Sequence, residues 1–364
     1  MKVFVFGIRG FPWVGGGAER HAEELYPRLV KLGYDITILT RRFKFSQWKG
    51  VKFIKIPYIN NPYLETMSHS ILCSLYCWRK KPDIVHIHNI GAFLLIPLMS
   101  FRGIKVVITI HSLNYQHPKW GHFARFILNL CEGIGISFSH RKIVVSREFV
   151  DFLRDKYKRF LLVNFIPNGV NEAEYIPSAL TIRKYKLKQR KYILSVGRIA
   201  SEKGTDKLIE SFKKFKIEYN NDYKLVVVGD DIYKTKFSRN LIVQEKDNDD
   251  IKFTGFLCGK ELAELYSNAG LFVSVSSHEG FPLSVLEALS YGLPIFVSKI
   301  PAHKNIKLPE ERYFDNEKEF IEGMKTLLEK GITQKEKDKY KKILKDEYDW
   351  EAIAKKTSRI YGKE

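Results

Sequence analysis

The stretch SSHEGFPLSVLEALSYG, residues 276–292, places a carboxylate, Glu287, in a predicted helix whose other side chains are nearly all apolar. A second carboxylate, Glu279, comes just before that helix. Burying an unpartnered carboxylate costs several kcal/mol, so we expect Glu287 to have a partner. From the helix it could accept two hydrogen bonds from a vicinal diol such as a ribose. The simpler interpretations are a helix-start charge for Glu279 and a buried ion pair for Glu287, but spacing and context favour ligand binding.

The loop HEGF connects a predicted strand, LFVSVSS, to this helix. Pro282 is expected at the first helical position, where its missing N–H does no harm. The backbone N–H groups of Phe281 and Leu283 are then expected to point toward a phosphate. Glu279, beside Gly280 in the loop, is expected to be free to reach a sugar hydroxyl.

The segment SVGRIASEKG ends another predicted strand and places Arg198 at the strand exit, with Lys203 just before a helix. A guanidinium fork and an ammonium group at a helix start suit a diphosphate. Two fixed cations could stabilise a departing nucleoside diphosphate without a metal ion. Taken alone, the segment fits a solvated basic loop equally well.

A glycine-rich loop follows the first predicted strand, in GIRGFPWVGGGAERHAEEL. Gly15, Gly16 and Gly17 precede a helix that we expect to begin near Ala18, and glycines let a backbone approach an anion closely. The loop does not match the dinucleotide fingerprint, and no acidic residue closes the second strand, so a nicotinamide enzyme is disfavoured.

Two series of strands alternating with amphipathic helical stretches predict the α/β elements that must position these residues. The first series is KVFVF, YDITILT, VKFIKIP, DIVHIHN, KVVITIH and KIVVS. The second series is YILSVGR, YKLVVVGD, IKFTGF, GLFVSVSS and PIFVS. Continuous apolar strands indicate parallel sheets covered on both faces. We predict two doubly wound domains joined near residues 171–190, with ligands at the carboxyl ends of the strands, and a charged, helical chain end from ERYFD onwards.

The positive charge of the chain is uneven. Residues 1–170 hold 25 Lys and Arg against 10 Asp and Glu, whereas the remainder holds 36 against 31. A basic N-terminal half suggests an anionic partner, such as nucleic acid, an acidic membrane surface or a phosphorylated substrate.

The four cysteines show neither a metal-binding nor a disulfide pattern, which suggests a reducing compartment. MKVFVFGIRG has too short an apolar run for a signal peptide, and IVHIHNIGAFLLIPLMSF is too polar for a membrane span. We therefore expect a cytoplasmic protein that does not span a membrane.

The ordered set of these motifs resembles glycosyltransferase family 4, the retaining enzymes of the GT-B fold. The motifs are EGFPLSVLE with its Glu-x7-Glu spacing, SVGRIASEKG, IPNGV and GGGAERHAEEL. TIHSLNYQHPKWG resembles a subgroup that builds bacterial surface polysaccharides. The resemblance implies an acceptor-side Rossmann-like domain over residues 1–170 and a donor-binding Rossmann-like domain over 171–348, the two facing a central cleft. It also implies a C-terminal helix over 349–364 that packs back on the first domain.

The resemblance also assigns roles to residues of this chain. Arg198 and Lys203 would hold the donor diphosphate, Glu287 the ribose and Glu279 the transferred sugar. The remaining expected site residues are Gly16 and Gly17 near the diphosphate, Gly280, Phe281, Pro282 and Leu283 along phosphate and sugar, and His111 beside donor sugar and acceptor hydroxyl. His111, Glu279, Arg198 and Lys203 form the expected catalytic set, with no metal and no cofactor.

Two departures from the family pattern affect specificity. The subgroup usually has Gly-Leu-Asp-Trp after the histidine, whereas this chain has Ser112-Leu113-Asn114-Tyr115, and it has three glycines where two are common. A rival interpretation takes His86, His88 and His111 as zinc ligands, although no nearby carboxylate or cysteine completes that site. Residues 247–249, DND, could suggest the metal-binding carboxylates of the other major glycosyltransferase fold, but a solvated turn is favoured.

The sequence thus predicts a retaining, metal-independent glycosyltransferase of the hexosyltransferase type. It would move a sugar from a UDP- or GDP-sugar to a saccharide or a polyprenyl-diphosphate-linked acceptor, in surface polysaccharide or lipopolysaccharide synthesis. The alternatives are a nucleotide-sugar epimerase of related fold and a non-catalytic partner subunit. Nucleic-acid binding is disfavoured because the basic residues lack interleaved aromatic groups.

Peripheral docking on the anionic inner face of the cytoplasmic membrane is a further hypothesis. The basic residues expected to serve it form two groups: Arg41, Arg42, Lys44, Lys49, Lys52 and Lys55; and Arg141, Lys142, Arg147, Arg154, Lys156, Lys158 and Arg159.

Overall fold

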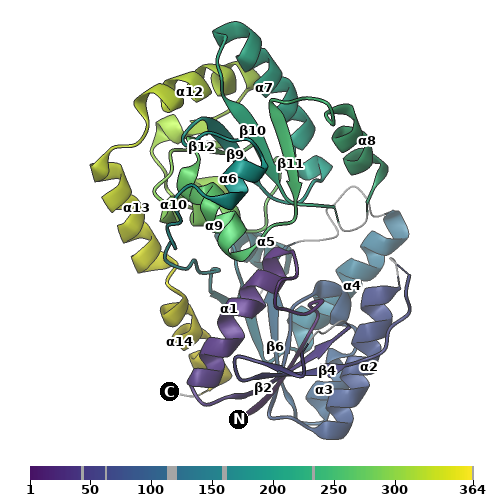
Figure 1. Cartoon of the computed structure of the whole chain (residues 1–364). Coiled ribbons are helices and arrows are strands. Elements are labelled where there is room, and N and C mark those ends of the chain that lie inside the picture. Colours follow the sequence, from purple (N-terminus) through teal and green to yellow (C-terminus); the bar gives the residue numbers. More distant parts are fainter. Residues whose placement is uncertain (42–44, 62–63, 113–120, 158–161, 232–233, 363–364) are drawn as a thin grey trace. The chain divides into compact units, whose positions relative to one another are not determined.

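The computed structural model describes the chain except residues 42–44, 62–63, 113–120, 158–161, 232–233 and 363–364. The chain divides into two compact units: the first unit is Met1–Gly169 with Trp350–Glu364, and the second unit is Val170–Asp349. Each unit is a sheet of mainly parallel strands with helices on both faces (Figure 1).

The sheet of the first unit has the strand order β3-β4-β2-β1-β5-β6-β7-β8, and its pairs are parallel except β3 with β4. Its strands are β1 (Lys2–Phe6), β2 (Asp35–Thr40), β3 (Gln47–Trp48), β4 (Val51–Lys55), β5 (Ile84–Ile87), β6 (Lys105–Ile110), β7 (Arg141–Val144) and β8 (Val163–Phe165). Its helices are α1 (Gly17–Lys31), α2 (Glu65–Lys80), η1 (Ile90–Ala92), α3 (Ile96–Phe101), α4 (His122–Phe138), α5 (Arg147–Tyr157) and α14 (Trp350–Tyr361).

Two apolar layers sandwich this sheet. One layer packs α2, α3, α4 and α5 against it, through buried residues such as Cys73, Cys77 and Ile136. The other packs α1 and α14, through residues such as Leu25 and Ile353. The two cysteines of α2 therefore face one way into the core. Figure 1 shows α2, α3 and α4 on one side of the strands and α1 with α14 on the other.

The sheet of the second unit has the order β11-β10-β9-β12-β13-β14 with parallel pairs. Its strands are β9 (Tyr192–Val196), β10 (Lys224–Val228), β11 (Ile251–Gly255), β12 (Leu271–Ser274), β13 (Ile295–Ser298) and β14 (Tyr313–Phe314). Its helices are α6 (Leu180–Lys184), η3 (Ser201–Lys203), α7 (Thr205–Tyr219), α8 (Lys236–Gln244), α9 (Gly259–Asn268), α10 (Leu283–Ser290), α11 (Pro301–Lys304), η4 (Glu310–Arg312), α12 (Glu317–Lys330) and α13 (Gln334–Glu347).

The α/β fold predicted from the strand series is confirmed, and each predicted strand is present. The expectation of an all-helical chain end from ERYFD onwards is wrong at its start, because Tyr313–Phe314 forms β14 at the edge of the sheet. Among the described residues, no helix has both the length and the apolar character needed to cross a bilayer.

Candidate active site

The candidate donor site lies at the carboxyl ends of β9 and β12, which are neighbours in the sheet of the second unit. Lys203 ends η3 after β9, and Glu279 lies in the loop after β12. Gly204, with φ +65°, has no room for a side chain, since a Cβ would lie 2.8 Å from the Val275 carbonyl oxygen. The Ser277 N–H donates to the Glu202 carbonyl at 2.9 Å. These contacts fasten the two loops together and so bring Lys203 to Glu279.

Lys203 and Glu279 form a largely buried ion pair, with side chains 20% and 10% exposed. Lys203 Nζ donates to Glu279 Oε1 at 2.5 Å, and the Ser276 hydroxyl donates to the same oxygen at 2.8 Å. Burial alone would raise the pKa of the Glu279 carboxyl, but the Lys203 ammonium and these hydrogen bonds bring that pKa below its usual value. Glu279 is therefore ionised at neutral pH, with one carboxylate oxygen already engaged rather than free for a sugar.

Arg198 also follows the carboxyl end of β9, but it is not part of the ion pair of Lys203 and Glu279. Its Nη2 donates to Glu202 Oε1 at 2.9 Å, and its side chain is 47% exposed. Each expected phosphate-binding cation is thus held by an acid of the second unit. A bound diphosphate would have to share these cations with, or take them from, Glu202 and Glu279.

Glu287 is half-buried on α10 and accepts a hydrogen bond from the Tyr266 hydroxyl at 3.0 Å. Tyr266 itself is buried and stacks on Tyr291, with ring centroids 5.2 Å apart. The apolar surroundings of Glu287 predicted that its carboxylate has a partner, and Tyr266 of α9 is one such partner. Glu287 remains exposed enough to meet a ligand.

Two expectations for the loop before α10 are wrong in detail. Pro282 is the N-cap residue and the helix begins at Leu283. The Leu283 N–H is turned back onto the Phe281 carbonyl at 3.0 Å, because Pro282, at φ −86° and ψ 69°, makes an inverse γ-turn. This N–H would have to leave that turn before it could donate to a phosphate. Gly280 and Phe281 are half-buried in the same loop.

His303, on α11, is a neighbour of this site that the sequence did not reveal. Hydrogen bonds connect its Nε2 to Ser274 Oγ at 3.5 Å and Ser274 Oγ to Ser276 Oγ at 3.3 Å, and Ser276 contacts Glu279. Burial lowers the pKa of His303, so its ring is neutral at pH 7. The local pattern PAHK offers no signal for this role, because the contact depends on how β12 and β13 pair.

In the first unit, Gly16 and Gly17 lie at the start of α1, after β1. Gly16 has φ +139°, and a Cβ there would lie 2.1 Å from Glu19 Oε2. Glu19 Oε1 accepts from the Arg9 N–H at 3.2 Å, so this carboxylate folds back over the glycine loop. The positive N-terminal end of α1 thus already has the Glu19 carboxylate beside it. A diphosphate that approached Gly16 would meet this negative charge.

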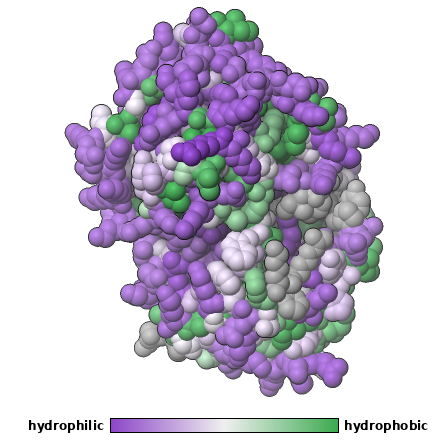
Figure 2. Space-filling view, in the orientation of Figure 1, coloured by the Kyte–Doolittle hydropathy of each residue, from purple (hydrophilic) through white to green (hydrophobic). Residues whose placement is uncertain are grey.

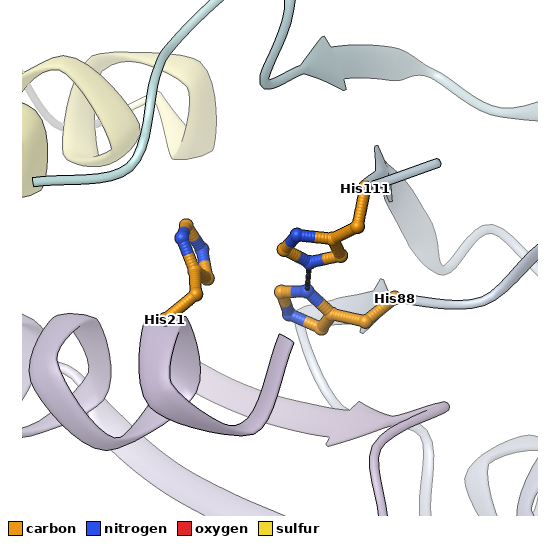
Figure 3. Close-up of side chains that lie close together, drawn as sticks. All are labelled: His21, His88 and His111. Carbon is orange, nitrogen blue, oxygen red and sulfur yellow. Dashed lines mark hydrogen bonds between the residues drawn. The ribbon is translucent and has the colours of Figure 1, made fainter. Parts of the chain in front are cut away.

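His111 follows β6 and belongs to a cluster of histidines (Figure 3). Its Nε2 lies 2.9 Å from His88 Nδ1, and the two rings stack with centroids 5.2 Å apart. The Tyr26 hydroxyl of α1 contacts both His88 Nε2 and His86 Nδ1. Burial, and then the neighbouring histidines, hold the pKa values of His88 and His111 well below the usual range. These rings are therefore neutral at pH 7.

His21, on α1, is the member of this cluster that the sequence analysis missed. Its ring faces His88 and His111 in Figure 3, at 5.0 Å from the His111 centroid. His21 Nδ1 donates to Asn168 Oδ1 at 2.6 Å, and burial lowers the His21 pKa to about 4. Its Nε2 is buried with no hydrogen-bond partner among the described residues. The motif GGGAERH contains this histidine, but the sequence analysis interpreted only its glycines as ligand-binding residues.

The chemical capacity of the cluster includes metal binding. One ring nitrogen each of His21, His88 and His111 lie within 4.8 Å of one another, whereas two nitrogens on one tetrahedral zinc lie about 3.3 Å apart. The expected trio differed, with His86 in place of His21. His86 instead bonds the Tyr361 and Thr109 hydroxyls at 2.6 and 2.7 Å. In the described part of the chain no carboxylate or thiol joins the trio. A hydrogen bond joins the rings of His88 and His111, whereas His21 is held by Asn168 instead.

The DND turn directly precedes β11, so within the second unit it lies at the sheet edge opposite the carboxyl ends of β9 and β12. Asp249 is exposed and pairs with Lys252 at 2.9 Å, as the solvated-turn interpretation predicted. Residues 113–115, where the chain departs from the family pattern after Ser112, lie outside the described residues.

Two protein-family models match this chain, one in each unit. The model for Glycosyltransferase Family 4 matches residues 15–174, and the model for Glycosyl transferases group 1 matches residues 179–343. The chain belongs to these glycosyltransferases. The two matches fall on the first and the second unit, so the glycine loop and the histidines belong to the family 4 region. Lys203, Glu279 and Glu287 belong to the group 1 region.

Similar proteins share the architecture at low sequence identity. An uncharacterised glycosyltransferase of Methanocaldococcus jannaschii is 26% identical over 99% of this chain and 98% of its own length. The alpha-monoglucosyldiacylglycerol synthase of Streptococcus pneumoniae is 24% identical over 84% of this chain and 73% of its own. Among solved structures, the sucrose-phosphate synthase of Thermosynechococcus elongatus has a TM-score of 0.80 at 19% identity, covering 99% of this chain and 98% of that one. HepE of Anabaena with UDP-glucose has a TM-score of 0.76 at 15% identity, with the same coverage. The glycosyltransferase therefore has the GT-B fold.

Proposed function

We propose that this glycosyltransferase is a retaining, metal-independent hexosyltransferase that uses a UDP- or GDP-sugar. Its acceptor is a saccharide or a lipid-linked saccharide, and it acts in surface glycan synthesis at the inner face of the cytoplasmic membrane. The observation that carries the proposal is the ion pair of Lys203 and Glu279, held where β9 and β12 end. That edge of a doubly wound sheet is where ligands bind. The UDP-glucose complex of HepE, a protein of the same fold, supports the donor class.

The proposed reaction needs no enzymatic nucleophile. The bond from the anomeric carbon to the diphosphate oxygen breaks, and a bond from the acceptor oxygen to that carbon forms on the same face. The acceptor proton ends on the departing diphosphate. Lys203 and Arg198 stabilise the charge that develops on this leaving group. Glu287 accepts from the ribose, and Glu279 from the transferred sugar.

In this proposal, the ammonium of Lys203 turns from Glu279 to the diphosphate. A charge-assisted hydrogen bond contributes about 1.5–3 kcal/mol, so Lys203→Met should weaken nucleoside diphosphate binding by at least about tenfold. Because that variant leaves the largely buried Glu279 without its cation, the double variant K203M/E279Q tests the loss of Lys203 without an unpaired buried charge. Lys191→Met removes a lysine of the same unit that pairs with Asp222 on the surface, and it serves as the matched control.

The experiment measures the thermal unfolding midpoint with UDP, GDP and their sugars, because a ligand stabilises the state it binds. We expect a rise for the wild type and the K191M control, and a clearly smaller rise for both Lys203 variants at the same nucleotide concentration. Transfer in EDTA and the anomeric configuration of the product by NMR test metal independence and retention. Wild-type turnover by K203M/E279Q, or an unchanged midpoint with every nucleotide tried, would refute the proposal.

A further inference from the structure

Three helices of the first unit, α2, α3 and α4, expose apolar and aromatic side chains to solvent. Phe101 is 83%, Phe123 80% and Phe126 65% exposed. The other exposed members of this set are Leu72, Leu75, Trp78, Leu130 and Phe138. We call these eight residues the aromatic face. Single exposed apolar residues are ordinary, but a contiguous group on packed helices marks an interaction surface.

The members of the aromatic face lie on adjoining helices. On α4, Phe123, Phe126 and Leu130 recur at intervals of three and four residues, so they form one stripe opposite the buried Cys131 and Ile136. At the far end of α4, Phe138 contacts Phe101 of α3 edge to face, with centroids 6.0 Å apart. Figure 2 shows green surface interrupted by purple over these helices, at the lower right of the molecule.

The charges on these helices are predominantly positive. Residues 65–138, from the start of α2 to the end of α4, contain seven Lys and Arg and three acids, Glu65, Asp83 and Glu132. Glu132 is fully buried and is held by Lys156 and Tyr157. Asp83 accepts from the Lys2 N–H at 2.6 Å, below the start of β5. Glu65 is paired with Arg41 and Asp83 is exposed, so positive charge predominates on these helices without excluding an acid.

Basic side chains lie on the same helices as the exposed rings, and one is in contact with a ring. The Arg102 guanidinium carbon lies 4.7 Å from the centre of the Trp78 ring, and Arg79 and Lys80 are exposed at the end of α2. Aromatic side chains with interspersed Arg and Lys are typical of surfaces that enter the boundary between lipid headgroups and acyl chains. An acidic protein partner would not require fully exposed phenylalanines.

We infer that the aromatic face docks on an anionic lipid bilayer, with Phe101, Phe123 and Phe126 entering the headgroup region. This inference rests on the proposed function only in expecting a lipid-linked acceptor. The face differs from the two basic groups expected from the sequence. In the first of them, Arg41 is buried against Glu65 and Lys52 pairs with Asp35. In the second, Lys156 holds the buried Glu132. Arg42, Lys44, Lys158 and Arg159 lie outside the described residues.

The test is sedimentation with vesicles, using the triple variant F123S/F126S/L130S. Vesicles of phosphatidylcholine with 30% phosphatidylglycerol, a composition of about one anionic lipid in three, are compared with pure phosphatidylcholine at low and high salt. The matched control is I217S/V243S, which removes two exposed apolar residues of the second unit. We expect the wild type and the control to bind anionic vesicles and the triple variant to lose at least about tenfold in affinity.

A charge variant, R79Q/R102Q, separates the two contributions. It should weaken binding to anionic vesicles at low salt, with little effect on pure phosphatidylcholine. The inference is overturned if the wild type does not bind anionic vesicles or if the triple variant binds as tightly as the wild type. It is also overturned if light scattering shows that the triple variant only converts a dimer to a monomer.

Nucleotide binding distinguishes this inference from the proposed function. The triple variant should keep the wild-type rise in unfolding midpoint with the nucleotide sugar. Retained nucleotide binding with lost vesicle binding supports the docking face. If the wild type bound vesicles but no nucleotide, the proposed function would be refuted and the docking face would still be supported.

Discussion

Glu279 is the residue at which the unliganded geometry and the proposed chemistry differ most. Its carboxylate neutralises Lys203 in this structure, although the proposal needs the ammonium for a diphosphate. Glu279→Gln should therefore keep or strengthen nucleoside diphosphate binding, because Lys203 loses its competitor. The same change should lower the rate of transfer at least about 100-fold, since the amide accepts the sugar hydroxyl less well. Titration calorimetry with UDP or GDP and a kinetic assay measure the two effects, and a parallel loss of both would contradict this account.

Tyr26 holds the ring of His88, which in turn contacts His111. Tyr26→Phe removes one hydroxyl from this buried chain, so His88 and His111 lose a fixed orientation. We expect kcat to fall by about tenfold with the KM for the donor nearly unchanged. Tyr34→Phe is the matched control, because that hydroxyl bonds Ser358 of α14 instead. An equal effect of the two variants on kcat would show that only folding of the first unit is involved.

Contacts between functional side chains could be predicted from the sequence only where the residues are close along the chain. Glu279 and Glu287 lie eight residues apart and their helix is visible in the pattern. His21 and Asn168, by contrast, are 147 residues apart and meet only because α1 packs where the chain leaves β8. The ion pair of Lys203 and Glu279 could not be predicted from the sequence either, because it depends on the pairing of β9 with β12.

At the scale of elements, Gly204 fixes the approach of η3 and α7 to the loop after β12. Gly204→Ala combines a left-handed φ with a contact of 2.8 Å to the Val275 backbone. Gly259→Ala is the control, because its φ is +59° and a Cβ there meets nothing within 4 Å. The control should cost about 1–2 kcal/mol of folding free energy from backbone strain.

The Gly204 variant should lose more stability than the control and should also bind nucleoside diphosphate less tightly, because Lys203 moves with its loop. Chemical denaturation and calorimetry of the two variants test this. If G204A matched G259A in both measurements, the fastening of the loops would not matter for the site.

The elements themselves followed from apolar patterning. Central strands such as β1 and β9 are largely buried and appear in the sequence as short runs rich in Val, Ile, Leu and aromatic residues. The strands that the patterns did not predict are β3, β8 and β14, each two or three residues long and lying at a sheet edge. Such strands bury too few side chains to leave a periodic signal, and their pairing is decided by the neighbouring strand.

At the scale of the whole molecule, the buried histidines make the first unit sensitive to acid. His69 is fully buried on α2, and burial followed by the nearby Arg41 charge lowers its pKa from 6.5 to about 4. His21 and His86 are lowered to about 4 and about 3. Between these values and 6.5 the unfolded chain binds protons that the folded unit does not. The stability that these histidines contribute is therefore fully present above pH 6.5 and is lost as the pH drops below it.

His69→Gln tests this dependence away from the candidate site. Each such histidine contributes a slope of about 1.4 kcal/mol per pH unit within its window, so the variant should lose less stability than the wild type between pH 6.5 and 4.5. Hydrogen exchange of the full chain reports the two units separately, and the difference should appear in residues 1–169 and not in 170–349. The absolute stability of the variant can shift through its altered contacts without affecting this comparison, because the slope depends only on the titrating group. Equal slopes for the two proteins would mean that His69 takes up its proton in the folded unit near pH 6.5.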